Sequence, residues 1–255
     1  MMVRKGILFF FYGCCLLLVS GCSVSYRLLL GVDTSPQWRS HSQIEKDFKR
    51  YRIKQDAVYV LDTASYTASV RARVQPIADS LMALGLSKES DTVLRAFKPF
   101  KDDMQPVQLR YFAANGEPIT KMVNCYLHPP IPMRWNVDGL FNQFPPAHNI
   151  AMLNNHQQPL AYFLPHVKDL QGQSVSLPIQ PETEYVALVM FNRYMIRPSR
   201  KLIKSLKDYH LQHPQAKVQV FFIHNHNSQL WMMYSPEQQA AVKVALQAMA
   251  TKQPK

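Results

Sequence analysis

The C-terminal part of the chain alternates apolar and amphipathic segments in a way that permits few folds. Residues 185–191 and 217–223 are short apolar runs typical of buried strands. Between them, residues 198–213 have helical periodicity and begin with Pro198 at a favourable first position. A strand, a helix and a strand joined by short links predict a right-handed parallel crossover. We therefore expect an α/β fold with a mixed sheet.

Further elements are predicted upstream and downstream of this unit. Residues 57–61 form a compact apolar run suited to a strand, and residues 76–84 suit a helix that starts at Pro76. Residues 107–112 and 119–127 flank Asn115-Gly116, which predicts a hairpin because both residues tolerate positive φ. Ser235 precedes Pro236 and is followed by Gln238, a pattern that predicts a capped last helix.

The N-terminus has the layout of a secretory signal. Arg4 and Lys5 precede a mostly apolar run at residues 7–19, followed by Ser20-Gly21-Cys22. As a helix this run would extend about 20 Å, which is too short for a hydrocarbon core about 30 Å thick. It therefore predicts an export signal over residues 1–21.

The stretch Leu18-Val19-Ser20-Gly21-Cys22 resembles the lipobox of bacterial lipoproteins. That resemblance implies that the Cys22 sulfur receives a diacylglyceryl group and that the signal is cut just before Cys22, which becomes lipid-anchored with fatty acids such as palmitate. Ser23, which is not Asp, favours the outer membrane in families where this position sorts, and the periplasmic face is expected. The alternative is an ordinary signal peptide with a chance Cys.

The rest of the chain divides into a tether and one domain. Residues 22–56, rich in basic side chains, predict a lipid anchor and tether that ends in a short helical lead-in. Residues 57–255 predict a single α/β domain. The proline-rich insertion near 128–165 either wraps the core or carries function.

Charge and cysteine content limit the partners and the chemistry. The chain has 29 Lys plus Arg against 17 Asp plus Glu, so removing Arg4 and Lys5 leaves 27 minus 17, or +10. Cys14 and Cys15 leave with the signal and Cys22 is lipidated, which leaves only Cys125 and allows no internal disulfide. The 47% hydrophobic content excludes a wholly disordered chain.

A second and shorter resemblance lies in residues 185–230. Residues 189–200 are similar to the strand-to-helix turn of thioredoxin-like proteins, in which an aromatic-rich strand runs into Cys-x-Pro-Cys and a basic residue. Pro198 and Arg200 match, whereas Ile196 and Ser199 stand where the two cysteines belong, so the redox chemistry of that family is not implied. Because few residues follow, a thioredoxin-like sheet would have to be completed by the N-terminal strands in an altered order.

Two groups of residues are candidates for chemistry. His224 and His226, two apart at a strand end, could point together toward a metal, but they are explained as readily by a polar strand exit. Leu61-Asp62-Thr63-Ala64 resembles the Asp-Thr-Gly turn of aspartic proteases without its glycine; otherwise Asp62 and Thr63 bond to local backbone. No cofactor or metal is expected.

One face of the helix predicted after Pro198 is basic. Arg197, Arg200, Lys201, Lys204 and Lys207 share it, opposite Leu202, Leu206 and Tyr209. Such a face is either a solvated surface or a contact for lipid phosphates or another anionic envelope polymer; nucleic acid is not an expected partner of an exported lipoprotein.

These observations favour a non-catalytic envelope lipoprotein that serves as a binding or scaffold module for an envelope protein or an anionic polymer, with a redox-inactive thioredoxin-like fold. The alternative is an envelope enzyme with its site near Asp62 or near His224 and His226.

Overall fold

The computed structural model describes residues 31–33, 36–53, 58–85, 102–124, 135–136, 139–146 and 157–251. The predicted signal, the lipidation site at Cys22 and the lone Cys125 lie outside these residues. Among the described residues, no helix is both long and apolar enough to cross a bilayer.

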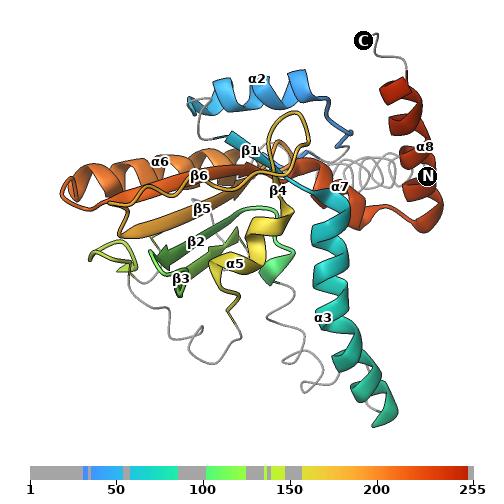
Figure 1. Ribbon diagram of the computed structural model, residues 1–255, viewed down its shortest axis with the longest axis horizontal. Coiled ribbons are helices and arrows are strands. Elements are labelled where there is room, and N and C mark those ends of the chain that lie inside the picture. The colour runs from blue at the N-terminus through green and yellow to red at the C-terminus, as the bar shows by residue number, and fades with distance from the viewer. Residues whose placement is uncertain are drawn as a thin grey trace, which may run out of the picture.

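A six-stranded mixed sheet forms the centre of the protein, with strand order β3-β2-β5-β6-β1-β4 (Figure 1). β5 is parallel to β6 and β6 to β1, whereas β2, β3 and β4 pair antiparallel with their neighbours. The strands are β1 (Val58–Leu61), β2 (Gln108–Ala113), β3 (Pro118–Val123), β4 (Val167–Lys168), β5 (Tyr185–Phe191) and β6 (Val218–His224). The predicted α/β class with a mixed sheet is confirmed.

The predicted crossover is present as β5, α6 (Ile196–Gln212) and β6. Residues 186–191 of β5 are fully shielded from solvent, which explains why this strand is a continuous apolar run without alternation. The hairpin of β2 and β3 also forms where expected, and Gly116 takes a φ of 88° in its turn. This hairpin precedes the crossover and pairs with β5, so strands from the N-terminal side complete the sheet.

Helices cover both faces of the sheet (Figure 1). On one face, α2 (His41–Tyr51) and α6 bury apolar side chains against Ala187, Val189 and Phe191 of β5. On the other, α3 (Thr63–Ala83) and the short α5 (Leu160–Phe163) pack against Val186, Leu188 and Met190. The alternation of β5 side chains between two hydrophobic clusters thus produces a three-layer arrangement.

The predicted tether contains part of the packed body. Within residues 22–56, α2 buries Ile44, Phe48 and Tyr51 in the same cluster as α6. These residues are spaced three and four apart, so they form one apolar stripe although the segment as a whole is rich in basic residues. The domain boundary drawn at residue 57 therefore separates segments that pack together.

The helix predicted at residues 76–84 starts thirteen residues earlier, at Thr63, and passes through Pro76. The prediction of its start was wrong because Asp62 caps the helix, and Tyr66, Thr67 and Val70 bury its first half. Pro76 lies in the more exposed second half, where water can satisfy the carbonyl group that loses its partner. Leu84, the last residue of the predicted helix, is 73% exposed.

The described parts of the proline-rich segment pack against the core. Trp135, Leu140 and Phe141 are buried, and the Phe141 ring stacks on Tyr209 of α6 with centroids 4.8 Å apart. Beyond residue 157 the chain forms α5, a 3₁₀ turn (Leu164–His166) and β4. These described residues therefore pack on the core.

Two helices follow β6. The α7 helix (His226–Met233) starts directly at the histidine pair and was not predicted, because its residues show no apolar periodicity. The side chain of its N-cap residue, Asn225, makes no capping bond. The last helix, α8 (Pro236–Thr251), begins as predicted: the Gln238 backbone N–H donates to Ser235 Oγ, and the Ser235 N–H donates to Gln238 Oε1.

Candidate functional site

The carboxyl ends of the parallel strands β5 and β6 meet at one edge of the sheet, which is where open α/β folds commonly bind ligands. Asn192 follows β5 and Asn225 follows β6, and both are almost completely buried. Asn192 Nδ2 donates to Asn225 Oδ1 at 3.0 Å and to the Pro106 carbonyl at 2.6 Å, and Asn225 Nδ2 donates to that carbonyl at 3.0 Å. These amides hold the chain before β2 against the edge, and their donors are used internally.

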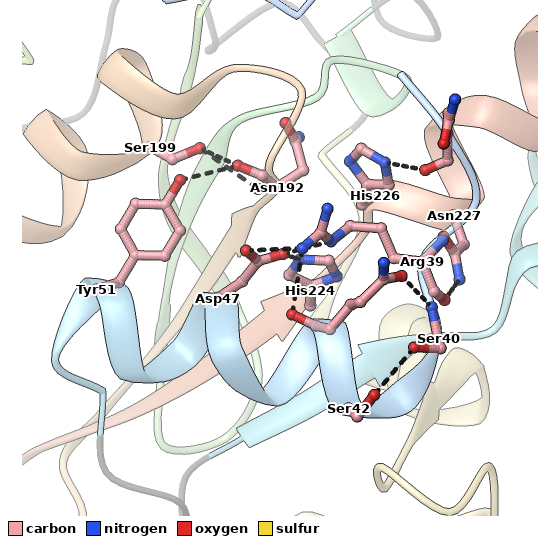
Figure 2. A network of polar contacts seen from close by, with 12 residues as sticks. Arg39, Ser40, Ser42, Asp47, Tyr51, Asn192, Ser199, His224, His226 and Asn227 are labelled. Carbon is pink, nitrogen blue, oxygen red and sulfur yellow. Dashed lines mark hydrogen bonds and ion pairs between the residues drawn. The ribbon is translucent and has the colours of Figure 1, made fainter. Parts of the chain in front are cut away.

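The turn that resembles the thioredoxin-like motif is closed by hydrogen bonds of its own. Ser199 is fully buried, and its Oγ donates to the Asn192 carbonyl at 3.1 Å. The Tyr51 hydroxyl of α2 donates to the same carbonyl at 3.1 Å, and burial, reinforced by the nearby charge of Asp47, raises the pKa of Tyr51 to about 12. Ser199 therefore fixes the turn through these hydrogen bonds (Figure 2), and its burial keeps it from solvent.

Two distant segments cover this turn. Val32 forms an antiparallel bridge with Met195, the Asp33 N–H donates to the Tyr194 carbonyl at 2.8 Å, and the Ile196 N–H donates to the Gly31 carbonyl at 3.1 Å. Trp135 Nε1 donates to the Pro198 carbonyl at 3.0 Å. The Ile196 N–H, in the first turn of α6 where a thioredoxin-like nucleophile would be stabilised, is thus bonded within the chain.

His224 lies beneath α2 in a buried ion-pair network (Figure 2). Its Nε2 is 3.3 Å from Oδ2 of Asp47, and Arg39 holds the same carboxylate with Nε 2.7 Å from Oδ2 and a hydrogen bond of 3.2 Å to Oδ1. Burial lowers the pKa of His224, and Asp47 offsets this only in part. The imidazole is therefore neutral at pH 7, and Arg39 balances the Asp47 charge.

His226 bonds to the main chain and not to Asp47, the partner of His224. Its Nε2 donates to the Gln37 carbonyl at 2.9 Å, while the side chain of Asn227 both accepts from and donates to the Arg39 backbone at 2.9 Å. Burial, which outweighs the bond to Gln37, lowers the pKa of His226 to about 4. These contacts fasten the residues before α2 to the start of α7.

The structure thus brings the two histidines together, with ring centroids 6.0 Å apart, but their Nε2 atoms face separate protein partners. Within the described parts of the chain, no three His, Cys, Asp or Glu side chains are grouped so that they could hold a metal ion. The description of the pair as a polar strand exit was incomplete, because Asp47, far away in sequence, completes the network. No sequence signal singled out Asp47 among the neighbouring charged residues.

Asp62 ends β1 and caps α3, as the local-backbone interpretation predicted. Its Oδ1 accepts from the Ser65 N–H at 2.9 Å, and its Oδ2 forms an ion pair of 2.5 Å with Lys168 of β4. Burial alone would raise the pKa of Asp62, but the bonds from Lys168 and Ser65 outweigh it and hold the pKa below its usual value. The carboxylate is therefore ionised and structurally engaged. The histidine pair follows the neighbouring parallel strand β6, where His224 is in register with Val60 of β1, but Asp62 and the two histidines bond to different partners.

A serine and a histidine that the sequence did not single out lie beside Asp62. Ser65 Oγ and His166 Nδ1 are 2.9 Å apart, within hydrogen-bond reach, and Ser65 is only partly buried. Burial lowers the pKa of His166, so the ring is neutral at pH 7 and able to accept a proton. The two residues are 101 positions apart, and the pairing of β1 with β4 brings them together. No spacing in the sequence could have predicted this pair.

A third cluster buries opposite charges between the sheet and α3. Arg110 bonds to Asp103 Oδ1 at 2.5 Å and Arg73 to Oδ2 at 2.7 Å, while Lys121 lies 3.2 Å from Asp102. Burial would raise the pKa of Asp103, but the cations, Arg110 first, hold it below its usual value. These groups are paired with one another and hold the segment before β2 against the core.

The basic face of α6 lies outward as predicted, with Leu202, Leu206 and Tyr209 buried on its other side. The structure enlarges this basic surface, because the C-terminal end of α2 lies beside α6: Lys207 Nζ donates to the Arg52 carbonyl at 3.0 Å. We call the combined region the α2–α6 basic surface. Its exposed cations are Lys46, Lys49, Arg50, Arg52, Arg197, Arg200, Lys204 and Lys207.

Comparison with known proteins finds no matching protein family, no matching curated protein and no matching solved structure.

Proposed function

We propose that this chain is a lipid-anchored protein of the bacterial cell envelope whose α/β domain acts as a non-catalytic binding or scaffold module. One observation carries the proposal. The edge of the sheet that would hold a catalytic site in a thioredoxin-like protein is filled by Asn192, Ser199, Asn225 and residues 31–33, all bonded to one another or to nearby main chain. A redox-inactive thioredoxin-like domain, with its hairpin before the crossover, fits this arrangement.

The anchor is tested by metabolic labelling with radioactive palmitate. Wild-type protein should incorporate label and fractionate with the outer membrane, and Cys22→Ser should do neither. Ser23→Asp should move the protein toward the inner membrane if its position sorts, with Ser23→Asn as the matched neutral control. An unlabelled wild-type protein would overturn the lipoprotein assignment.

The binding role is tested by complementation of a deletion strain. We expect Cys22→Ser to fail, because it removes the anchor, and Ser65→Ala or the double change His224→Asn with His226→Gln to complement once expression is matched. Crosslinking in intact envelopes then identifies the component bound by the anchored wild type and not by Cys22→Ser.

A second function is favoured by one contact, the 2.9 Å approach of Ser65 Oγ to His166 Nδ1 beside Asp62. A serine activated by a neutral histidine is the nucleophile–base pair of acyl-transfer enzymes. Under this alternative the protein is an envelope hydrolase with its site near Asp62, and Ser65→Ala and His166→Gln would each abolish complementation while leaving the fold intact.

A further inference from the structure

The α2–α6 basic surface concentrates cations with little acidic compensation. Of the acidic residues in the two helices, Asp47 is buried against Arg39 and His224. Asp208 pairs with Lys204 across one turn, and Glu45 is half-buried. The remaining exposed side chains that point away from the core are mostly Lys and Arg, so the positive potential of this side extends into solvent.

The cations are close enough to repel one another. Burial first, and the charge of Arg50 second, lower the pKa of the Arg193 guanidinium, which precedes α6 and lies within electrostatic reach of α2. Arg200 is likewise near enough to influence Tyr51 of α2. Residues from both helices thus form one continuous electrostatic surface.

The chain enters the described structure on this same side. A Cβ atom added to Gly31 would lie 2.6 Å from Cγ of Arg197, so the backbone at Gly31 runs directly against the stem of a cation of the basic surface. Gly31 lies nine positions after Cys22, and a fully extended chain over nine residues reaches about 30 Å. A lipid on Cys22 would therefore keep the N-terminal end of α6 within that distance of the bilayer.

We propose that the α2–α6 basic surface docks on the anionic phospholipid headgroups of the membrane that holds the anchor. This inference rests on the proposed lipidation of Cys22. The occupant is a lipid surface because the short link places these cations beside headgroup phosphates, and an anchored domain needs only weak attraction to stay docked. The opposite side, where α3 and α5 lie, then faces away from the membrane and is left for a protein partner.

The test uses the full-length protein, purified from the membrane fraction and reconstituted with vesicles. One set contains phosphatidylethanolamine and phosphatidylglycerol at about 3:1, and the other contains only phosphatidylcholine; flotation reports the anchor. Exposed lysines are then modified with an amine-reactive reagent and quantified by mass spectrometry. In phosphatidylglycerol vesicles Lys46, Lys49 and Lys204 should react roughly threefold to tenfold more slowly than in phosphatidylcholine vesicles, whereas Lys217 and Lys243 should react equally in both.

Charge-matched variants separate docking from net charge. Lys49→Glu, Arg50→Glu and Arg200→Glu together should abolish the protection of Lys46 and Lys204. The control is Arg71→Glu, Lys217→Glu and Lys243→Glu, which removes the same charge elsewhere and should preserve it. Salt at about 0.5 M should also remove the protection of Lys46 and Lys204.

Equal lysine reactivity in the two vesicle types, with flotation intact, would overturn docking and leave the anchor standing. Equal loss of protection in both variant sets would also overturn it. Failure to float would instead refute the lipidation on which the inference rests.

Discussion

Nε2 of His224 lies 3.3 Å from Oδ2 of Asp47, and both side chains are almost wholly buried between α2 and the end of β6. Asp47→Ala would leave the buried Arg39 Nε and His224 without their carboxylate. We expect the free energy of unfolding to fall by about 3 kcal/mol, as measured by urea denaturation at pH 7. Asp47→Asn is the control, because its amide oxygen can still accept from Arg39, and it should cost clearly less. If Asp47→Ala and Asp47→Asn lower the unfolding free energy equally, the amide oxygen that Asn retains does not replace the Asp47 carboxylate as a partner of Arg39.

Acid should destabilise the fold through His226. Its pKa is about 4 in the folded protein against 6.5 ordinarily, so the unfolded chain binds the proton more readily. The stability contributed by the neutral ring is complete above pH 6.5 and is lost as the pH falls toward 4. At pH 5 the loss is about 2 kcal/mol for this one group.

The variant His226→Gln isolates this contribution. Its amide can still donate to the Gln37 carbonyl, but it does not titrate. The difference in unfolding free energy between pH 7 and pH 5 should therefore shrink by about 2 kcal/mol in the variant. His210, whose pKa burial also lowers to about 4, remains to titrate in both proteins. If the unfolding free energy depends on pH equally in wild type and in His226→Gln, protonation of His226 is not what destabilises the fold in acid.

The elements that could be predicted from sequence are those whose burial pattern is local. A few consecutive residues are enough to recognise the β5 run, the Asn115-Gly116 turn and the Ser235 capping box. The α2 stripe was misjudged because Ile44, Phe48 and Tyr51 are separated by charged residues, one of which, Asp47, is itself buried. Whether a charge in such a helix faces solvent depends on its partners. Asp47 is enclosed by Arg39 and also by His224, which is 177 positions away.

The site was harder to predict for the same reason. Ser65 and His166 meet only because β4 pairs with β1, and β4 is two residues long with no strand signal of its own. Asp62 was interpretable, because a cap bonds three residues ahead and that spacing can be read directly. Residues that meet only through tertiary contacts, as Ser65 and His166 do, have no regular spacing in the sequence by which they could be recognised.

Asp103 should be the most costly charged residue to remove. Asp103→Ala would leave Arg110, whose side chain is 3% exposed, as an uncompensated buried cation, and we expect a loss of about 3–5 kcal/mol in unfolding free energy. Arg73→Ala should cost less, because the Arg73 side chain is 21% exposed and water can replace part of the pair. The double change Arg110→Met with Asp103→Leu should recover most of the stability. A double variant as unstable as Asp103→Ala would show that the ion pair itself is required.

Substitutions of Asp62 distinguish the two functional proposals, because Asp62 both caps α3 and places a negative charge beside His166. Asp62→Ala removes the cap of α3 and should lower the unfolding free energy by about 1 kcal/mol. Asp62→Asn keeps an oxygen that can accept from the Ser65 N–H and loses only the partly exposed ion pair with Lys168, so it should cost less unfolding free energy than Asp62→Ala. The negative charge of Asp62 raises the pKa of the His166 ring, and the Asn variant removes that charge. A binding module should therefore complement a deletion strain fully with Asp62→Asn, whereas a hydrolase that needs this charge near its base should lose activity while remaining folded. Failed complementation by a stably folded Asp62→Asn protein would overturn the non-catalytic assignment, and full complementation by both Asp62→Asn and Ser65→Ala would exclude the hydrolase.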